Sequence, residues 1–181
     1  FGGATALLPI IASSILHVGA VGYGVLRAAP GVGAVAVGLI LSGRPIRQRV
    51  GPILLCAVAL FGVFTILLGV SDSFWLSFGA LFLLSASDMV SVFIRSTLIQ
   101  TVTPVHMMGR VSAVNSVFIG SSNEIGMFES GVTAQWWGTV PSVVLGGVAT
   151  LGVVAFTAWR LPSLRQLGRM DELRPSSFGT T

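Results

Sequence analysis

Six long apolar segments, separated by short polar joins, limit what this 181-residue chain can fold into more than any other feature. A helix that crosses a membrane needs about 20 mostly apolar residues. Because no segment alternates polar and apolar residues as a barrel strand does, helices are the expected spanning form. The expected spans cover residues 1–17, 22–43, 52–70, 74–100, 109–133 and 140–160, and residues 161–181 form an arginine-rich tail.

The composition excludes a soluble domain. Only 9% of the residues are charged, whereas a soluble domain carries about 25% and needs them to cover its surface. The basic residues are few and do not combine with aromatic residues into a surface that could read a nucleic acid backbone, so we exclude nucleic acid as a partner. The sequence therefore predicts an all-α membrane protein surrounded by a lipid bilayer.

The arginines orient the predicted spans. Eight of the ten basic residues, all arginines, lie in alternate joins or in the tail, and the other joins contain none. Because positive charge near a span resists translocation, these joins and the C-terminus are expected in the cytoplasm, with the spans in the plasma membrane. The eight are Arg44, Arg47 and Arg49 after the second span, Arg110 after the fourth, and Arg160, Arg165, Arg169 and Arg174 after the sixth.

Five ionisable residues lie inside the predicted spans. Each costs about 2.5–3.5 kcal/mol at the middle of a bilayer and therefore indicates a function. The second, fourth and fifth spans carry them and are expected to be inner helices, whereas the third and sixth spans are uncharged and are expected on the outside. The five are Arg27, Asp88, Arg95, Glu124 and Glu129.

Depth along the helices, counted from the span centres, limits which of these residues can pair. Asp88 lies near the midplane with no arginine at its level, which suits a proton carrier, although a hydrogen bond that packs two helices is an equally open interpretation. Arg27 lies level with Glu124 and Glu129, and one of them is its expected partner, either in a structural salt bridge or at a substrate. Arg95 either extends to the cytoplasmic surface or lines a cavity.

The fifth span has one polar face over several turns, which predicts that it lines a cavity. This face contains Ser112, Asn115, Ser122, Gly126 and Glu129. The expected substrate contacts are Asn115, Ser122 and Asn123. Glu124 lies about 140° around the helix from Glu129, so the two glutamates do not share a face. Glu129 is close to the outer end of the span, where a solvated end residue is the alternative interpretation.

The remaining polar residues predict neither catalysis nor a metal centre. His17 and His106 have no neighbouring ligands, and no HExxH or GxSxG motif occurs, so we expect no enzyme activity, no cofactor and no metal. The single cysteine, Cys56, sits in an apolar segment and is expected to be a buried, inert thiol. Four tryptophans lie at predicted span ends, as in an aromatic belt. They are Trp75, Trp136, Trp137 and Trp159.

The charged second, fourth and fifth spans, with the uncharged third and sixth, resemble the C-terminal half of a major facilitator superfamily transporter. That resemblance implies two inverted three-helix repeats, which form half of a twelve-helix transporter and need the missing N-terminal half as a partner. Three segments are similar to the enterobactin-exporter-like branch of the superfamily. They run from Asp88 to Pro104, from Gly109 to Glu124 and from Phe128 to Gly131.

The resemblance also implies two cytoplasmic gating loops. The loop that contains Arg44–Arg49 is similar to the superfamily's Gly/Asp/Arg motif, but Ser42 stands at its acidic position. A latch in this loop would therefore lack its carboxylate. The second gating loop precedes the fifth span and contains Gly109 and Arg110.

Together these features predict a secondary-active exporter in which a proton and a small organic solute, such as a drug or a siderophore, move by alternating access. Asp88 is the expected proton site, and Arg27, Arg95, Glu124 and Glu129 are expected to line the cavity or to latch it. The alternative is a non-catalytic membrane scaffold or partner subunit that is locked by the same charges.

Overall fold

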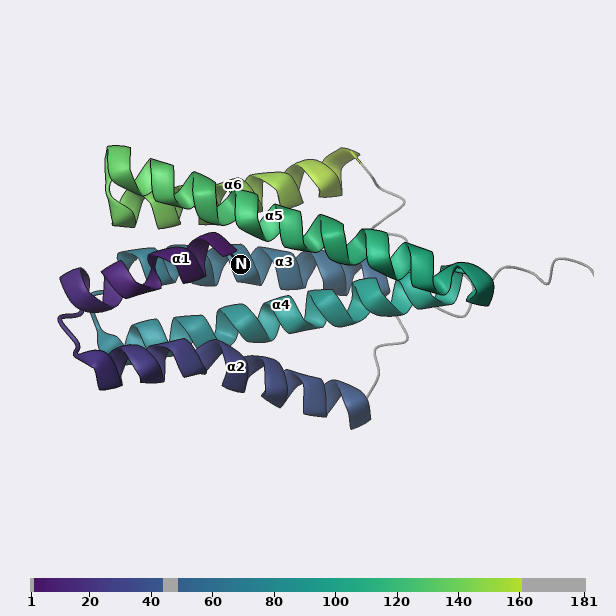
Figure 1. Cartoon of the computed structure of the whole chain (residues 1–181), viewed down its shortest axis with the longest axis horizontal. Helices are drawn as coiled ribbons and strands as arrows, with labels where there is room; N and C mark the ends of the chain where they lie inside the picture. The colour runs from purple at the N-terminus through teal and green to yellow at the C-terminus, as the bar shows by residue number, and fades with distance from the viewer. Residues whose placement is uncertain (1, 44–48, 161–181) are drawn as a thin grey trace, which may run out of the picture.

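The computed structural model describes residues 2–43 and 49–160, and these form a bundle of helices joined by short turns (Figure 1). In chain order the helices are α1 (Gly2–Ile10), the π-helical turn η1 (Ile11–Ile15), α2 (Ala20–Gly43), α3 (Val50–Val70), α4 (Phe74–Val102), the 3-10 turn η2 (Val105–Met107), α5 (Met108–Trp137) and α6 (Thr139–Arg160). No strand occurs within the described ranges. The prediction of an all-α protein is therefore confirmed.

The helices of the bundle suit a membrane. Four of them, α2, α3, α4 and α6, are long and apolar enough to cross one. The segment Gly3–Ile15, which contains most of α1 and η1, is apolar but shorter, and α5 has 30 residues but is more polar than the others. The helices from α2 to α6 begin and end within about one turn of the predicted spans. The chain is an all-α membrane protein.

Each of the first three helices packs against one of the last three. α1 packs against α5, α2 packs against α4, and α3 packs against α6. Thus, the first helix of each three-helix unit contacts the second helix of the other unit. The third helices of the two units contact each other. This is the pairing that a twofold relation between α1–α3 and α4–α6 generates. In Figure 1, α3 passes behind α1, and α6 passes behind α5.

Glycines allow the closest of these contacts. Gly33 of α2 lies so close to the main-chain carbonyl of Phe82 in α4 that a Cβ atom on it would overlap with the oxygen. A Cβ atom on Gly147 of α6 would lie 2.8 Å from the carbonyl oxygen of Gly62 in α3. Small residues at such crossings let helices approach in lipid, where hydrophobicity does not drive helices together.

The buried core is concentrated at the end of the bundle where α5 and α6 join. Its larger cluster combines side chains of α1, η1, α2, α3, α4 and α6, with Leu8, Leu26 and Leu81 among its members. The second cluster contains only Val50 and Ile94 among buried residues, where α3 begins and α4 nears its end. The bundle is therefore tightly packed at one end and loosely packed at the end where α4 leads into α5.

Cys56 is not buried, so that prediction was wrong. Its side chain is exposed on α3. Apolar neighbours along the sequence indicate an apolar environment, which can be the interior of the protein or the lipid. On α3 the side that carries Cys56 points away from the other helices.

Candidate functional site: a cleft between helices α4 and α5

The face of α4 that carries Asp88 is covered at one end and open at the other. Ser77 and Ser85, in the first half of this face, are buried. Asp88 is half-buried, and Val92 and Arg95, about one and two turns further on, are exposed. The core around α1 covers the first half of the face and leaves the second half open.

The open half of this face forms one wall of a cleft, and the first half of α5 forms the other. A hollow of about 250 Å³ lies between Val92 and Arg95 on α4 and Asn115 on α5. A second hollow of about 480 Å³ adjoins it and contains Arg110 and Phe118. The two hollows share Asn115 and Ile99, so they form one continuous cleft.

Four polar side chains line this cleft, and one of them is Ser96 on α4. Arg95 comes from α4, and Arg110 and Asn115 come from the first turns of α5. The Arg95 Nε atom donates to the Ser91 carbonyl oxygen over 3.4 Å, which leaves its terminal guanidinium nitrogens available. Two guanidinium groups and one carboxamide supply donors on an otherwise mostly apolar surface. Such a surface suits a partly apolar solute that carries acceptor groups.

Asp88 lies at the inner end of the open half of α4, one turn before Val92. Within the part of the chain that the structure describes, no side chain or main-chain group forms a hydrogen bond or an ion pair with its carboxyl group. The neighbouring hydroxyl of Ser87 donates to the Leu83 carbonyl at 2.8 Å and is therefore already engaged. The carboxyl group of Asp88 is thus without a partner and lies one turn before the cleft, whose lining does not include it.

Arg27 does not meet the glutamates of α5. Its Nη1 atom donates to the hydroxyl of Tyr23, one turn earlier on α2, over 2.9 Å. Neither Glu124 nor Glu129 lies within the 4.0 Å of an ion pair to this guanidinium. The helix pairing explains why, because α2 packs against α4 whereas α5 packs against α1. Sequence analysis did not single out Tyr23, although its spacing of four residues from Arg27 places both on one helix face.

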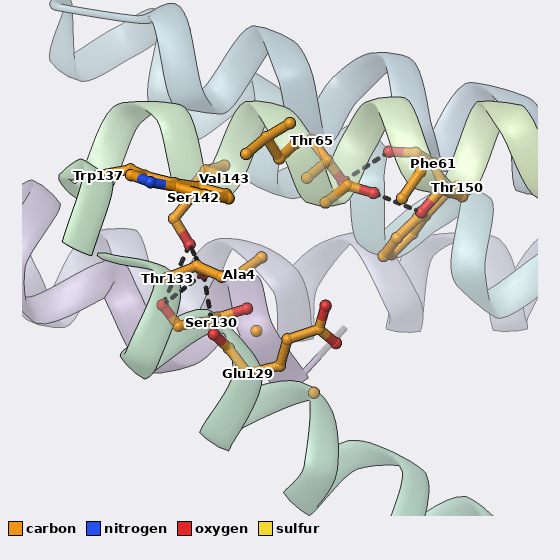
Figure 2. A pocket seen from close by; sticks show the side chains of 15 residues that line it. Ala4, Phe61, Thr65, Glu129, Ser130, Thr133, Trp137, Ser142, Val143 and Thr150 are labelled. Carbon is orange, nitrogen blue, oxygen red and sulfur yellow. Dashed lines mark hydrogen bonds between the residues drawn. The ribbon is translucent and has the colours of Figure 1, made fainter. Parts of the chain in front are cut away.

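α5 is the least covered helix of the bundle. None of its residues is buried, and Ser122, Asn123 and Glu124 are exposed. Gly126 faces α1, and Glu124 lies about 160° around the helix from it, on the side away from the rest of the bundle. Glu129 lies only about 60° from Gly126 and lines a separate cavity between α1, α3, α5 and α6 (Figure 2).

The expected gating loops are described in part. Arg44 and Arg47 lie outside the described residues. Arg49 is exposed immediately before α3, in a left-handed conformation with a φ of 53°. Gly109 and Arg110 belong to the first turn of α5, and Arg110 reaches the cleft from there. This places one of the expected gating residues in the wall of the candidate substrate site.

Neither histidine contributes to the cleft. His17 lies between η1 and α2 and His106 lies in the turn η2, and both are exposed. Across residues 2–43 and 49–160, no group of three or more His, Cys, Asp or Glu side chains could hold a metal ion.

All four tryptophans are exposed and lie at helix ends. Trp75 begins α4 and Trp136 and Trp137 end α5, at the same end of the bundle, whereas Trp159 ends α6 at the opposite end (Figure 1). Tryptophan favours the boundary between lipid and water, so this arrangement fits a bundle that crosses a bilayer.

An apolar helical bundle with tryptophan at both ends and a polar cleft open at one end defines a multi-pass membrane protein of the transporter class. The model of the transmembrane secretion effector family matches residues 2–177, which is nearly the whole chain. The chain therefore belongs to this family of the major facilitator superfamily, and the resemblance to a transporter of that superfamily is confirmed. Neither a search of curated proteins nor a search of solved structures gave a match.

Proposed function

We propose that the chain forms one six-helix half of a secondary-active transporter in the plasma membrane, with its C-terminus in the cytoplasm. The transporter exports a small organic solute, such as a drug or a siderophore, in exchange for protons by alternating access. The position of Asp88 carries this proposal. Its carboxyl group has no partner among the described residues and lies on α4 one turn before Val92, which lines the cleft together with Arg95 and Asn115, so a proton at Asp88 and a solute in the cleft would be close to each other.

The direction in which the cleft opens supports loading from the cytoplasm. The cleft lies at the loosely packed end of the bundle, next to Arg110 and on the same side as Arg49. Because arginine-bearing joins remain in the cytoplasm, this end of the bundle is the cytoplasmic one in our proposal. A cleft open on that side accepts a solute that is to be exported.

The exposure of α5 supports the existence of a second helical half. Ser122, Asn123 and Glu124 are exposed on a helix of which no residue is buried. Polar and charged side chains at membrane depth need protein or water around them, because lipid satisfies neither. A second half that covers α5 and closes the far side of the cleft meets this need. The exchanged helix pairs also fit two inverted three-helix repeats.

Asp88→Asn in the complete transporter tests the proposed coupling. Asparagine keeps the size and polarity of the side chain but carries no exchangeable carboxyl proton. In inverted membrane vesicles with an imposed pH gradient, we expect the variant to lose gradient-driven uptake of ethidium and enterobactin, one probe for each solute class. Exchange of labelled for unlabelled probe should continue, because it needs no net proton movement.

Asp72→Asn is the matched control, because Asp72 is exposed in the turn between α3 and α4 and lies outside the cleft. This variant should transport like the unmodified protein. If Asp88→Asn still accumulates a probe as the unmodified transporter does, Asp88 is not the coupling site. If the unmodified transporter moves neither probe and dissipates no pH gradient when either is added, the scaffold alternative is favoured.

A further inference from the structure

A second cavity, of about 450 Å³, lies between α1, α3, α5 and α6 (Figure 2). It shares no lining residue with the cleft between α4 and α5. It also lies behind α1 and α5, next to the paired helices α3 and α6. In Figure 2, Glu129 stands on one side of the cavity and Thr65 and Thr150 on the opposite side.

The turn between α5 and α6 builds one wall of this cavity. Gly138 has a φ of 94°, which favours glycine, and it brings Thr133 and Ser142 opposite each other. Their hydroxyl oxygens lie 2.7 Å apart. Thr133 also donates to the Glu129 carbonyl at 2.8 Å, and Ser142 to the Ser130 carbonyl at 3.1 Å. If Thr133 donates to Ser142, Ser142 donates to the Ser130 carbonyl, and if Ser142 donates to Thr133, Thr133 donates to the Glu129 carbonyl. In both arrangements the two hydroxyl protons are bound within this wall.

The opposite wall repeats this arrangement. The Thr65 hydroxyl donates to the Phe61 carbonyl at 2.8 Å, and the Thr150 hydroxyl donates to the Gly146 carbonyl at 2.9 Å. A hydroxyl group has one proton and two lone pairs, so a hydroxyl whose proton is engaged offers only acceptors. Four hydroxyl groups of the lining, from three helices, therefore present lone pairs to whatever occupies the cavity.

Glu129 gives the cavity a negative charge without a partner. Among the described residues, no arginine or histidine lies within 4.0 Å of its carboxylate. The Glu129 side chain is exposed as well as part of the lining, so its carboxylate is accessible both to solvent and to an occupant of the cavity. Trp137 also lines the cavity and adds an aromatic ring, which attracts cations to its face. A positively charged occupant matches all of these groups.

The size of the cavity determines the kind of cation. The cavity, of about 450 Å³, is much larger than a single water molecule or a bare ion requires. Among the described residues no three His, Cys, Asp or Glu side chains could together hold a metal ion, and this lining contains a single carboxylate, that of Glu129. Cavities of roughly 300–1,000 Å³ are the size that encloses small organic molecules.

We propose that this cavity binds a small organic ammonium ion. In the bound state the ammonium group donates to the Glu129 carboxylate and to the hydroxyl oxygens of Thr133 and Ser142, and its apolar part lies against Trp137 and Val143. The site is separate from the cleft that carries the proposed transport, and its occupancy is measured by binding alone.

The probe that tests this proposal is 4-phenylbutylammonium, and its neutral analogue is 4-phenylbutan-1-ol. Binding of both compounds is measured by equilibrium dialysis against the full chain in lipid nanodiscs, with empty nanodiscs to subtract partition into lipid. The ammonium ion should bind at a saturable site with one molecule per chain. The alcohol has the same shape but no charge, and it should bind at least tenfold more weakly.

Two pairs of variants locate the binding. Glu129→Gln removes the charge and keeps the size, so it should weaken ammonium binding at least tenfold, whereas Glu124→Gln, on the far side of α5, should not. Gly146→Leu fills space, because Gly146 lines the cavity and a Cβ atom on it meets no atom within 4 Å. It should abolish binding. Gly152→Leu is its control, because Gly152 is equally open, lies on the same helix and is not part of the lining.

Three results would overturn the proposal. Equal binding of the ammonium ion and the alcohol would mean that charge plays no part. Unchanged binding in Glu129→Gln or Gly146→Leu would place the probe elsewhere. Displacement of the probe by millimolar sodium chloride, with no displacement by choline chloride at the same concentration, would identify an inorganic cation as the occupant.

Discussion

The hydroxyl oxygens of Thr133 and Ser142 lie 2.7 Å apart, one on each side of the turn that joins α5 to α6. Ser142 is buried and also bonds to the carbonyl oxygen of Ser130. Because α5 buries no residue of its own, apolar packing does little to hold it. This polar contact and the small residues that face α1 are what attach α5 to the bundle.

Ser142→Ala should therefore lower the stability of the protein. Loss of the hydroxyl removes contacts with Thr133 and Ser130 in a buried place, which costs about 0.5–1.5 kcal/mol. For a chain of this size that corresponds to a fall of roughly 2–6 °C in the midpoint of thermal unfolding in detergent. Ser14→Ala, at an exposed position in η1, should leave the midpoint unchanged. Equal midpoints for the two variants would contradict the prediction.

Gly33→Ala should separate α2 from α4. The new methyl group would overlap with the Phe82 carbonyl, so the helices must move apart, at a cost of about 1–3 kcal/mol. Gly31→Ala lies two residues away, where a Cβ atom meets nothing within 4 Å, and should be neutral or stabilising because alanine favours helix. Thermal unfolding of both variants measures the difference. A Gly33→Ala protein as stable as Gly31→Ala would argue against this close crossing.

Labelling of single cysteines should show which end of the bundle faces the cytoplasm. With Cys56→Ala as background, Arg49→Cys and Ser73→Cys place one thiol at each end of α3, at exposed positions. In intact cells a membrane-impermeant maleimide should label Ser73→Cys at once, and Arg49→Cys only after the membrane is permeabilised. The reverse pattern would invert the proposed topology and, with it, the side on which the cleft opens.

Arg95→Gln should weaken solute binding in the cleft. The variant keeps a polar side chain but loses the charged donors next to Asn115. We expect the half-saturation concentration for transport to rise about tenfold, which corresponds to about 1.4 kcal/mol. Arg160→Gln changes an exposed arginine at the end of α6 and should have no such effect. If both variants saturate at the same concentration as the unmodified transporter, Arg95 does not contact the solute.

The helices could be predicted from the sequence because lipid leaves few choices. A main chain in hydrocarbon must satisfy its own hydrogen bonds, so each long apolar segment becomes a helix that ends in the next polar join. The turn at Gly138 illustrates this, because it lies between the fifth and sixth predicted spans. α5 is also a single helix although it is more polar, but it ends four residues beyond its predicted span, whereas its neighbours α4 and α6 end within two residues of theirs.

Lateral neighbours could not be predicted in the same way. Counting residues gives the depth of Arg27, Glu124 and Glu129, but it does not say which helices touch. The pairing of α2 with α4 separates Arg27 from both glutamates, and Tyr23 becomes its hydrogen-bond partner instead. The error for Cys56 has a related origin, because the hydropathy of a segment does not distinguish the side that faces lipid from the side that faces protein.

The polar face of the fifth span predicted that Gly126 and Glu129 line a cavity, but the residues on the other sides of this cavity could not be predicted. Its acceptor groups come from Thr65 on α3, Thr133 on α5, and Ser142 and Thr150 on α6, which are far apart along the chain and belong to no motif. Only the pairing of α3 with α6, and of α5 with both α1 and α6, brings them together. The sequence left open whether Glu129 lines a cavity or is a solvated end residue, and in the structure its side chain both lines the cavity and is exposed.

The unequal distribution of the core determines where this protein is stiff. The end that holds Leu8, Leu26 and Leu81 ties five of the six helices into one body, whereas the first half of α5 has no buried side chain to lose. The first half of α5 is joined to α4 through the short turn η2, and it lines the cleft beside Arg95 without a buried side chain of its own. The shape of this cleft therefore depends on a helix that the core holds less than it holds the other five.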